Sequence, residues 1–369
     1  MLPRRVLMTA DTVGGVWEYS LDLSRALAAA GVSVTLATMG GEPSPRQRRA
    51  ADTIPSLTLR TSTWKLEWMA EPWDDVDASG GWLLELDGAI RPDVIHLNGF
   101  CHGALPWSAP VLMVAHSCVL SWWESVKGEV APPASDTYRR AARQGLTAAG
   151  CVVAPSRWMA GEIQRLYGVK TAAISNGRDR AAGFAPGGDK QPVVLAAGRL
   201  WDPAKNLAAL DRACAGVSWP LYLAGPAQGP FGDVFVAENG TMLGPLAQTE
   251  LATWMRQASI YALPAKYEPF GLSALEAALC GCALVLGDIP SLRENWEGAA
   301  LFVDPDDPSS IRGALDALID TPELLDSLGR RAAQRARQFT TQRMADGYLA
   351  AYAQLIEAAR APEPRATSA

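Results

Sequence analysis

The stretch "SIYALPAKYEPFGLSALEAAL", residues 259–279, contains the change of pattern that decides the fold. Its first part is an apolar run rich in β-forming side chains, which predicts a buried strand. From about residue 271 onward Leu272, Leu275 and Leu279 recur at helical spacing and predict one buried helix face. The stretch is therefore a strand, a loop and a helix, the repeating unit of a parallel sheet covered by helices.

Two carboxylates flank the start of this predicted helix. Glu268 lies in the loop and Glu276 lies in the helix. A helix start has unpaired N–H groups and favours negative charge, so the acids can simply stabilise the helix, and this alternative stays open. In the functional interpretation, the amides near Phe270 and Gly271 bind a phosphate while the acids accept hydrogen bonds from neighbouring hydroxyl groups. Acids beside a phosphate indicate a sugar nucleotide.

The same alternation of strand and helix patterns runs through the chain. Apolar runs followed by turns are "RVLMTAD", "VSVTLATM", "DVIHLNG", "VLMVAHS", "CVVAPS" and "KTAAISNG", and then "PVVLAAGRL", "PLYLAGP", "TMLGPL", "SIYALPA" and "CALVLGD". A stretch rich in Gly, Pro and Asp at 176–192 separates the two series and predicts a linker. We therefore expect an α/β protein with two doubly wound, Rossmann-like domains, residues 1–185 and 186–340, and ligands in the cleft between them.

Composition excludes several classes of function. The net charge of −6 argues against a nucleic-acid partner, which needs clustered Lys and Arg. The six cysteines lie mostly in or beside apolar runs, as buried reduced residues do, and the three histidines have no metal-ligand spacing. The sequence has neither a signal-peptide pattern nor an apolar run of membrane-spanning length, so we expect a cytoplasmic location.

Further candidates follow other predicted strands. "GRLWDPAKN", residues 198–206, has Arg199 and Lys205 on a loop, where they would neutralise a leaving diphosphate unless they are ordinary surface cations. Gly14 and Gly15 follow the first strand without a G-x-G-x-x-G pattern, so a tight structural turn explains them equally well. His116 ends the run "VLMVAH", either as a structural residue or within reach of a substrate hydroxyl group.

Together, "YEPFGLSALEAALCGCALVLGD", "AAGRLWDPAKN", "ISNGRD", "VVAPSRWMAGEI", the paired glycines and His116 resemble glycosyltransferase family 4 over nearly the whole chain. The resemblance implies a GT-B fold and a nucleotide-diphosphate sugar donor of UDP or GDP type. It also implies retention of anomeric configuration, front-face attack, and no obligatory metal or other cofactor. The last helix, about residues 341–358, would return to the first domain, which faces the acceptor.

The resemblance also assigns roles to residues. Glu276 would bind the ribose, whereas Glu268 and His116 would lie at the transferred sugar as the catalytic candidates. The base would be covered by Leu243, Gly244, Pro245 and Leu246. The donor diphosphate would be held by Arg199, Lys205, Gly14, Gly15, Phe270, Gly271 and Leu272.

Two departures from the family pattern are visible. Residues 289–291 are Ile-Pro-Ser where a Gly-Gly turn is common, and Arg178 replaces a small apolar residue. We expect neither to touch the donor contacts.

The acceptor side is less defined: a sugar, a glycolipid or a small molecule all remain open. Trp122 and Trp123 follow His116 closely and offer ring faces for stacking. Some relatives dock weakly on membranes through basic segments, a role that Arg46, Arg48 and Arg49 would suit.

Three rival functions remain for comparison. A nicotinamide-dependent dehydrogenase would need the missing glycine fingerprint. A metal-dependent GT-A transferase would use an Asp-x-Asp pair, and Asp75 and Asp77 have that spacing but lie in an acidic loop instead of ending a strand. A catalytically silent GT-B partner subunit would have lost the donor-binding residues. This chain keeps the four charged ones, which are Arg199, Lys205, Glu268 and Glu276.

Overall fold

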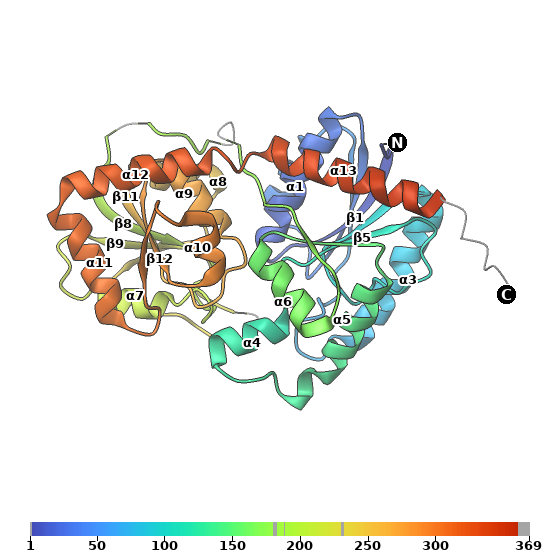
Figure 1. Cartoon of the computed structure of the whole chain (residues 1–369), viewed down its shortest axis with the longest axis horizontal. Helices are drawn as coiled ribbons and strands as arrows, with labels where there is room; N and C mark the ends of the chain where they lie inside the picture. The colour runs from blue at the N-terminus through green and yellow to red at the C-terminus, as the bar shows by residue number, and fades with distance from the viewer. Residues whose placement is uncertain (1, 180–182, 188, 230–231, 361–369) are drawn as a thin grey trace, which may run out of the picture.

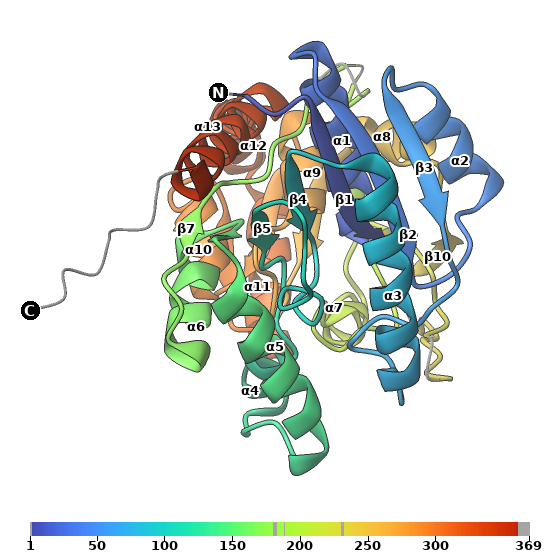
Figure 2. The ribbon, with the colours of Figure 1, turned by 90° about the vertical axis from the view of Figure 1, so that its right-hand side faces the viewer.

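The computed structural model describes residues 2–179, 183–187, 189–229 and 232–360 and arranges them in two α/β units that lie side by side (Figure 1). One sheet has seven strands in the order β3-β2-β1-β4-β5-β6-β7, and the other has six in the order β10-β9-β8-β11-β12-β13. Figure 2 views the molecule from the side of the first sheet, whose strands follow one another across the picture. The strand order reverses between β1 and β4 and between β8 and β11, which is where ligands bind in such sheets. The predicted α/β class with two doubly wound sheets is confirmed.

We call the first sheet with its helices and α13 the N-terminal unit, and the second sheet with α7 to α12 the C-terminal unit. The strands of the first sheet are β1 (Arg5–Asp11), β2 (Ser33–Met39), β3 (Leu57–Thr61), β4 (Val94–Leu97), β5 (Val111–Val114), β6 (Cys151–Ala154) and β7 (Ala172–Ala173). Those of the second are β8 (Gln191–Ala197), β9 (Leu221–Ala224), β10 (Thr241–Gly244), β11 (Ala258–Leu263), β12 (Ala283–Gly287) and β13 (Leu301–Val303).

The helices follow the strands as the sequence pattern predicts. The N-terminal unit has α1 (Gly15–Ala29), α2 (Pro45–Asp52), α3 (Trp73–Ile90), α4 (Val119–Lys127), the 3₁₀ turn η1 (Pro133–Ser135), α5 (Asp136–Ala148), α6 (Arg157–Tyr167) and α13 (Thr341–Arg360). The C-terminal unit has α7 (Leu207–Ala213), α8 (Gln248–Gln257), α9 (Leu272–Leu279), α10 (Pro290–Trp296), α11 (Pro308–Asp320) and α12 (Pro322–Ala336).

Both faces of the first sheet are buried, because successive side chains of β1 point to opposite sides. Val6 and Met8 pack into a cluster with α1 and α13, whereas Leu7 packs into a second cluster with α3, α5 and α6. Helix α13 contributes the fully buried Tyr348 and Tyr352 to the first cluster, so the last helix of the chain covers the N-terminal unit (Figure 1).

The predicted linker at 176–192 falls between the two sheets, and β8 begins within it at Gln191. Its residues 180–182 and 188 lie outside the described residues. Within the described residues, no helix is both long enough and apolar enough to cross a membrane.

Candidate functional site

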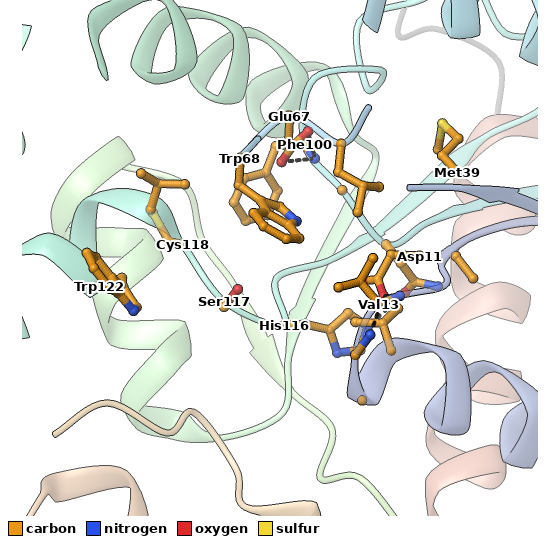
Figure 3. Close-up of a pocket in the computed structure, with 18 of the residues that line it drawn as sticks. Asp11, Val13, Met39, Glu67, Trp68, Phe100, His116, Ser117, Cys118 and Trp122 are labelled. Carbon is orange, nitrogen blue, oxygen red and sulfur yellow. Dashed lines mark hydrogen bonds between the residues drawn. The ribbon is translucent and has the colours of Figure 1, made fainter. Parts of the chain in front are cut away.

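A cavity of about 420 Å³ lies beyond the carboxyl ends of β1, β4 and β5 (Figure 3). The N-terminal unit contributes Gly14, Gly15 and His116 to its lining, together with Trp122 and Trp123 of α4. The C-terminal unit contributes residues 199, 201 and 202 from the loop after β8. The fold therefore brings predicted donor and acceptor residues from distant parts of the chain to one cavity.

The start of α9 lies close to the paired glycines of the N-terminal unit. A Cβ atom at Gly15 would lie 3.5 Å from Leu272 Cδ1, and one at Gly14 would lie 3.2 Å from Arg199 Nη1. A side chain at Gly15 would therefore make ordinary contact with Leu272, and one at Gly14 would crowd the Arg199 guanidinium. Gly271 precedes α9 with a φ of 89°, a left-handed conformation that favours glycine.

Glu268 is buried and held by groups that the sequence assigned to the donor phosphates. Its Oε1 accepts a hydrogen bond from the Gly271 amide at 3.0 Å and lies 3.5 Å from the amide nitrogen of Phe270. Its Oε2 forms an ion pair with Lys205 Nζ. In the structure these amides and Lys205, which the sequence assigns to the donor phosphates, contact the Glu268 carboxylate, so they form an anion-binding group and their role as phosphate ligands stays a prediction.

Arg199 belongs to a second charged pair on the loop after β8. Its Nη2 lies 2.6 Å from Asp202 Oδ2, and its guanidinium lies over the Trp201 ring at 5.5 Å. Burial acts to raise the pKa of Asp202, but the charges of Arg199 and Lys205 outweigh it and lower that pKa. The loop therefore holds Arg199 in place beside Gly14 while leaving its guanidinium partly exposed to the cavity.

Glu276, the predicted ribose ligand, is buried in a charge cluster. Its Oε1 lies 2.7 Å from Arg178 Nη2, and Arg178 also pairs with Asp22 and, at 3.6 Å, with Glu18 of α1. Burial raises the pKa of Glu276 to about 7, although Arg178 acts in the opposite direction. The expectation that Arg178 would not touch the donor contacts is wrong: Arg178 links the ribose candidate to the N-terminal unit.

The other family departure also reaches the site. The Ser291 hydroxyl donates a 2.6 Å hydrogen bond to the carbonyl oxygen of Glu268. The expectation that residues 289–291 would not touch the donor contacts is therefore wrong as well. Both misses have one reason: these contacts depend on the packing of α10 and of the segment after β7, which local sequence patterns do not describe.

His116 follows β5 by two residues, so it lies beyond the strand instead of ending it. Its Nε2 lies 2.8 Å from Asn98 Oδ1, and Asn98 Nδ2 donates to the Thr9 carbonyl at 2.6 Å. Asn98 Oδ1 is therefore an acceptor, so His116 carries its proton on Nε2 and leaves Nδ1 as an acceptor. Burial and the neighbouring His96 lower the pKa of His116 to about 3, so the ring is neutral. The sequence missed Asn98, although its place directly after β4 was a usable signal.

We expect His116 to make the fold sensitive to acid. Its pKa is lowered from 6.5 to about 3, so the unfolded chain gains a proton as pH falls below 6.5 while the folded chain does not. The stability from neutral His116 is present above pH 6.5 and is lost as pH falls toward 3. Melting temperatures between pH 7.5 and 5.0 should fall less steeply for His116→Gln than for the wild type. Parallel pH profiles would contradict the assignment.

Several predicted donor residues do not line this cavity: Lys205, Glu268, Phe270, Gly271, Leu272, Glu276 and the four residues proposed to cover the base. Leu243 and Leu246 pack partly on the core of the C-terminal unit, and Gly244 and Pro245 lie between them at the end of β10. These four residues do not line the cavity, so their role over a nucleotide base stays a prediction.

The positions of Asp75 and Asp77 do not suit the metal-binding Asp-x-Asp pair of a GT-A transferase. Asp75 and Asp77 lie in α3, where residues two apart point in different directions, instead of after a strand. No group of three or more His, Cys, Asp or Glu residues within the described ranges is arranged to hold a metal ion.

The sequence was compared with family models and with known proteins, and the matches agree with an arrangement of two α/β units. Residues 13–182 match the family model "Glycosyltransferase Family 4", and residues 191–321 match "Glycosyl transferases group 1". The chain is 26% identical to a D-inositol 3-phosphate glycosyltransferase of Jonesia denitrificans, covering 92% of this chain and 91% of that protein. It is 27% identical to D-inositol 3-phosphate glycosyltransferase 2 of Catenulispora acidiphila, covering 98% and 97%.

Two solved structures share the fold. Sucrose-phosphate synthase from Thermosynechococcus elongatus superposes with a TM-score of 0.80 at 21% identity, covering 96% of this chain and 100% of that one. Anabaena HepE, solved with UDP and glucose, has a TM-score of 0.74 at 15% identity, covering 95% and 100%. Both likenesses concern the arrangement of the two units, and they agree with the expected GT-B architecture.

Proposed function

Because the chain belongs to the glycosyltransferases of the GT-B fold, with a Family 4 domain followed by a group 1 domain, we propose that it is a retaining, metal-independent enzyme that uses a nucleoside-diphosphate sugar. The observation that carries the proposal is the cluster of Lys205, Glu268 and the Gly271 amide, with Arg199 on the same loop as Lys205. These groups combine two cations, a helix start and one carboxylate, which suit a diphosphate with a sugar attached.

Donor binding replaces one anion by another. The diphosphate oxygens take the place of the Glu268 carboxylate at Lys205 and at the start of α9, and Arg199 completes the positive surroundings. Glu268 then turns to hydroxyl groups of the transferred sugar. Because the protein's own cations neutralise the leaving diphosphate, no divalent ion is needed at this step.

The reaction proceeds on one face of the sugar. The bond from the anomeric carbon to the diphosphate oxygen breaks, and the acceptor oxygen forms its bond on the side that the diphosphate leaves. The acceptor proton passes to the departing phosphate, so charge and atoms balance without a covalent intermediate. Two observations support this route. Asp11, the carboxylate beside His116, accepts hydrogen bonds from the amides of residues 13 and 14, and Glu268 is assigned to sugar hydroxyl groups, so neither is assigned as a nucleophile.

The ribose ligand in this scheme is Glu276, which exchanges part of its contact with Arg178 for the ribose hydroxyl groups. UDP-type and GDP-type donors remain the candidates for the base, and the HepE complex makes UDP the first to test.

Location and membrane contact complete the proposal. All six cysteines are free thiols, in agreement with a reducing cytoplasmic compartment. The exposed Arg46, Arg48 and Arg49 of α2 suit a weak peripheral contact with anionic lipid.

We expect calorimetry with UDP and GDP to detect binding of at least one of them in the presence of a chelator. Activity with the matching sugar donor should survive the chelator, because Arg199 and Lys205 replace the metal. An NMR spectrum of the product should show the anomeric configuration of the donor. Loss of activity on chelation would contradict metal independence, and an inverted product would contradict retention.

A further inference from the structure

The cavity extends away from the proposed donor groups toward α4. Asp11 and His116 lie at one end, near Gly14 and Arg199, and Trp122 lies at the other, with Ser117 and Trp68 between them (Figure 3). The acceptor must occupy this space if the sugar is transferred at the donor end, so the lining describes the acceptor.

Aromatic rings dominate the walls. The aromatic lining residues other than histidine are Trp68, Phe100, Trp122, Trp123, Tyr138 and Trp201. Trp122 and Trp123 meet edge to face at 5.9 Å, and Lys127 lies 5.9 Å from the centre of each ring. Faces of this kind stack on flat rings and bury apolar surface. A volume of about 420 Å³ suits a small molecule with one or a few rings.

The charged side chains of the lining are already paired within the protein. Setting the histidines aside, the described residues that line the cavity include three carboxylates and two cations: Asp11, Glu67, Asp202, Lys65 and Arg199. Each carboxylate has its own partners. Asp11 accepts from the amides of residues 13 and 14 at 3.0 Å, Glu67 accepts from those of residues 100 and 101, and Asp202 binds Arg199.

The cations are similarly engaged. Lys65 Nζ donates to the carbonyl oxygens of Ala70 and Glu71 at 3.1 and 3.3 Å, and Arg199 pairs with Asp202 at 2.6 Å. A phosphate group on the acceptor would therefore compete with the donor diphosphate for Arg199. Among the other described lining residues it would meet three carboxylates and one lysine, so the remaining charge is unfavourable for an anion.

Polar groups that can orient a hydroxyl group gather at the donor end. His116 offers Nδ1 as an acceptor, and Ser117 is the next residue along the wall. From the contrast between this polar end and the aromatic end at α4, we propose that the acceptor is an uncharged, ring-bearing alcohol such as a phenol, not a phosphorylated polyol. The proposal rests on the proposed function and specifies the substrate class of its acceptor site.

The test compares two acceptors with one donor. Wild-type enzyme, with whichever nucleotide sugar it binds, is given 4-methylumbelliferone, a flat phenol, and D-inositol 3-phosphate. We expect the phenol to be glycosylated and the inositol phosphate to be inert or at least 100-fold slower in kcat/KM. Preferred transfer to D-inositol 3-phosphate would overturn the acceptor proposal and leave the proposed glycosyl transfer standing, whereas failure of all nucleoside diphosphates to bind would count against the donor site.

Substitutions of cavity residues test whether the phenol binds in this cavity. Trp68→Ala and Trp122→Ala should each raise the KM for the phenol at least 10-fold and leave the Kd of the nucleoside diphosphate unchanged. Trp254→Ala is the matched control, because Trp254 packs on Tyr222 in the C-terminal unit, outside the cavity, and should leave the phenol KM unchanged. Equal binding of the phenol by all three variants, measured by fluorescence titration as well as by turnover, would overturn the proposal.

Discussion

Replacing Glu268 with Gln should lower kcat by about 100-fold or more, a loss typical for removal of one group that stabilises developing charge. The affinity for bare nucleoside diphosphate should stay nearly unchanged or rise slightly, because the lost carboxylate competes with phosphate for Lys205 and the Gly271 amide. Steady-state kinetics and calorimetry on the same preparation measure the two effects.

The alternative for Glu268 is a purely stabilising role at the start of α9, and a second helix start provides the control. Asp307 caps α11 by accepting a 2.8 Å hydrogen bond from the Ser309 amide, away from the cavity. Asp307→Asn should lower the melting temperature and leave turnover per folded molecule intact. If Glu268→Gln behaves in the same way, the catalytic assignment fails.

Replacing Arg178 with Met should reduce the free energy of unfolding by about 3 to 5 kcal/mol, as expected when one member of a buried charge cluster is removed. Arg178 is almost completely buried, and its loss leaves Asp22 and Glu276 without their shared cation. Because Glu276 is also the proposed ribose ligand, the affinity for nucleoside diphosphate should fall about 10-fold. Denaturant unfolding and calorimetry measure the two losses.

An exposed ion pair serves as the comparison for Arg178. Arg330 pairs with Asp326 on the surface of α12, where such contacts contribute little, so Arg330→Met should be nearly silent. The double variant Arg178→Met with Glu276→Gln should recover part of the stability, because it neutralises the buried carboxylate that loses its ion pair, whereas Asp22 keeps Arg25 at 3.1 Å. Equal, small losses for Arg178→Met and Arg330→Met would show that the buried cluster does not stabilise the fold.

The sequence predicts the fold well where one strong local pattern decides each element. The runs that predicted strands correspond to eleven of the strands, and α9 begins one residue after the predicted Gly271, which is its N-cap. Strands β3 and β13 were missed for different reasons. The expected strands were taken from continuous apolar runs, whereas β3 is an edge strand whose polar and apolar residues alternate, a strand pattern that such runs do not include. β13 has only three residues, too few to show a period.

The candidate site is predictable as a set of groups but not as a set of partners. Glu268, Lys205 and Gly271 were identified from their places after strands, yet their mutual contacts appear only in the folded chain. Arg178 shows the limit more clearly, because it is 156 positions from Asp22 in the sequence. Pairs at such separations follow from the packing of segments that lie far apart in the chain, which no local period records.

Helix α13 gives this fold an unusual order of completion during synthesis. The strands and the other helices of the N-terminal unit leave the ribosome first, but the helix that buries Tyr348 and Tyr352 beside α1 is made after the whole C-terminal unit. At about 5 to 20 residues per second, the delay is on the order of 10 to 35 seconds. During that interval the side of α1 that meets α13 in the folded chain has no cover, although β1 and β2 already pack on the helix. The nascent chain therefore presents apolar surface of the kind that chaperones bind, and a chain released early would keep that surface exposed.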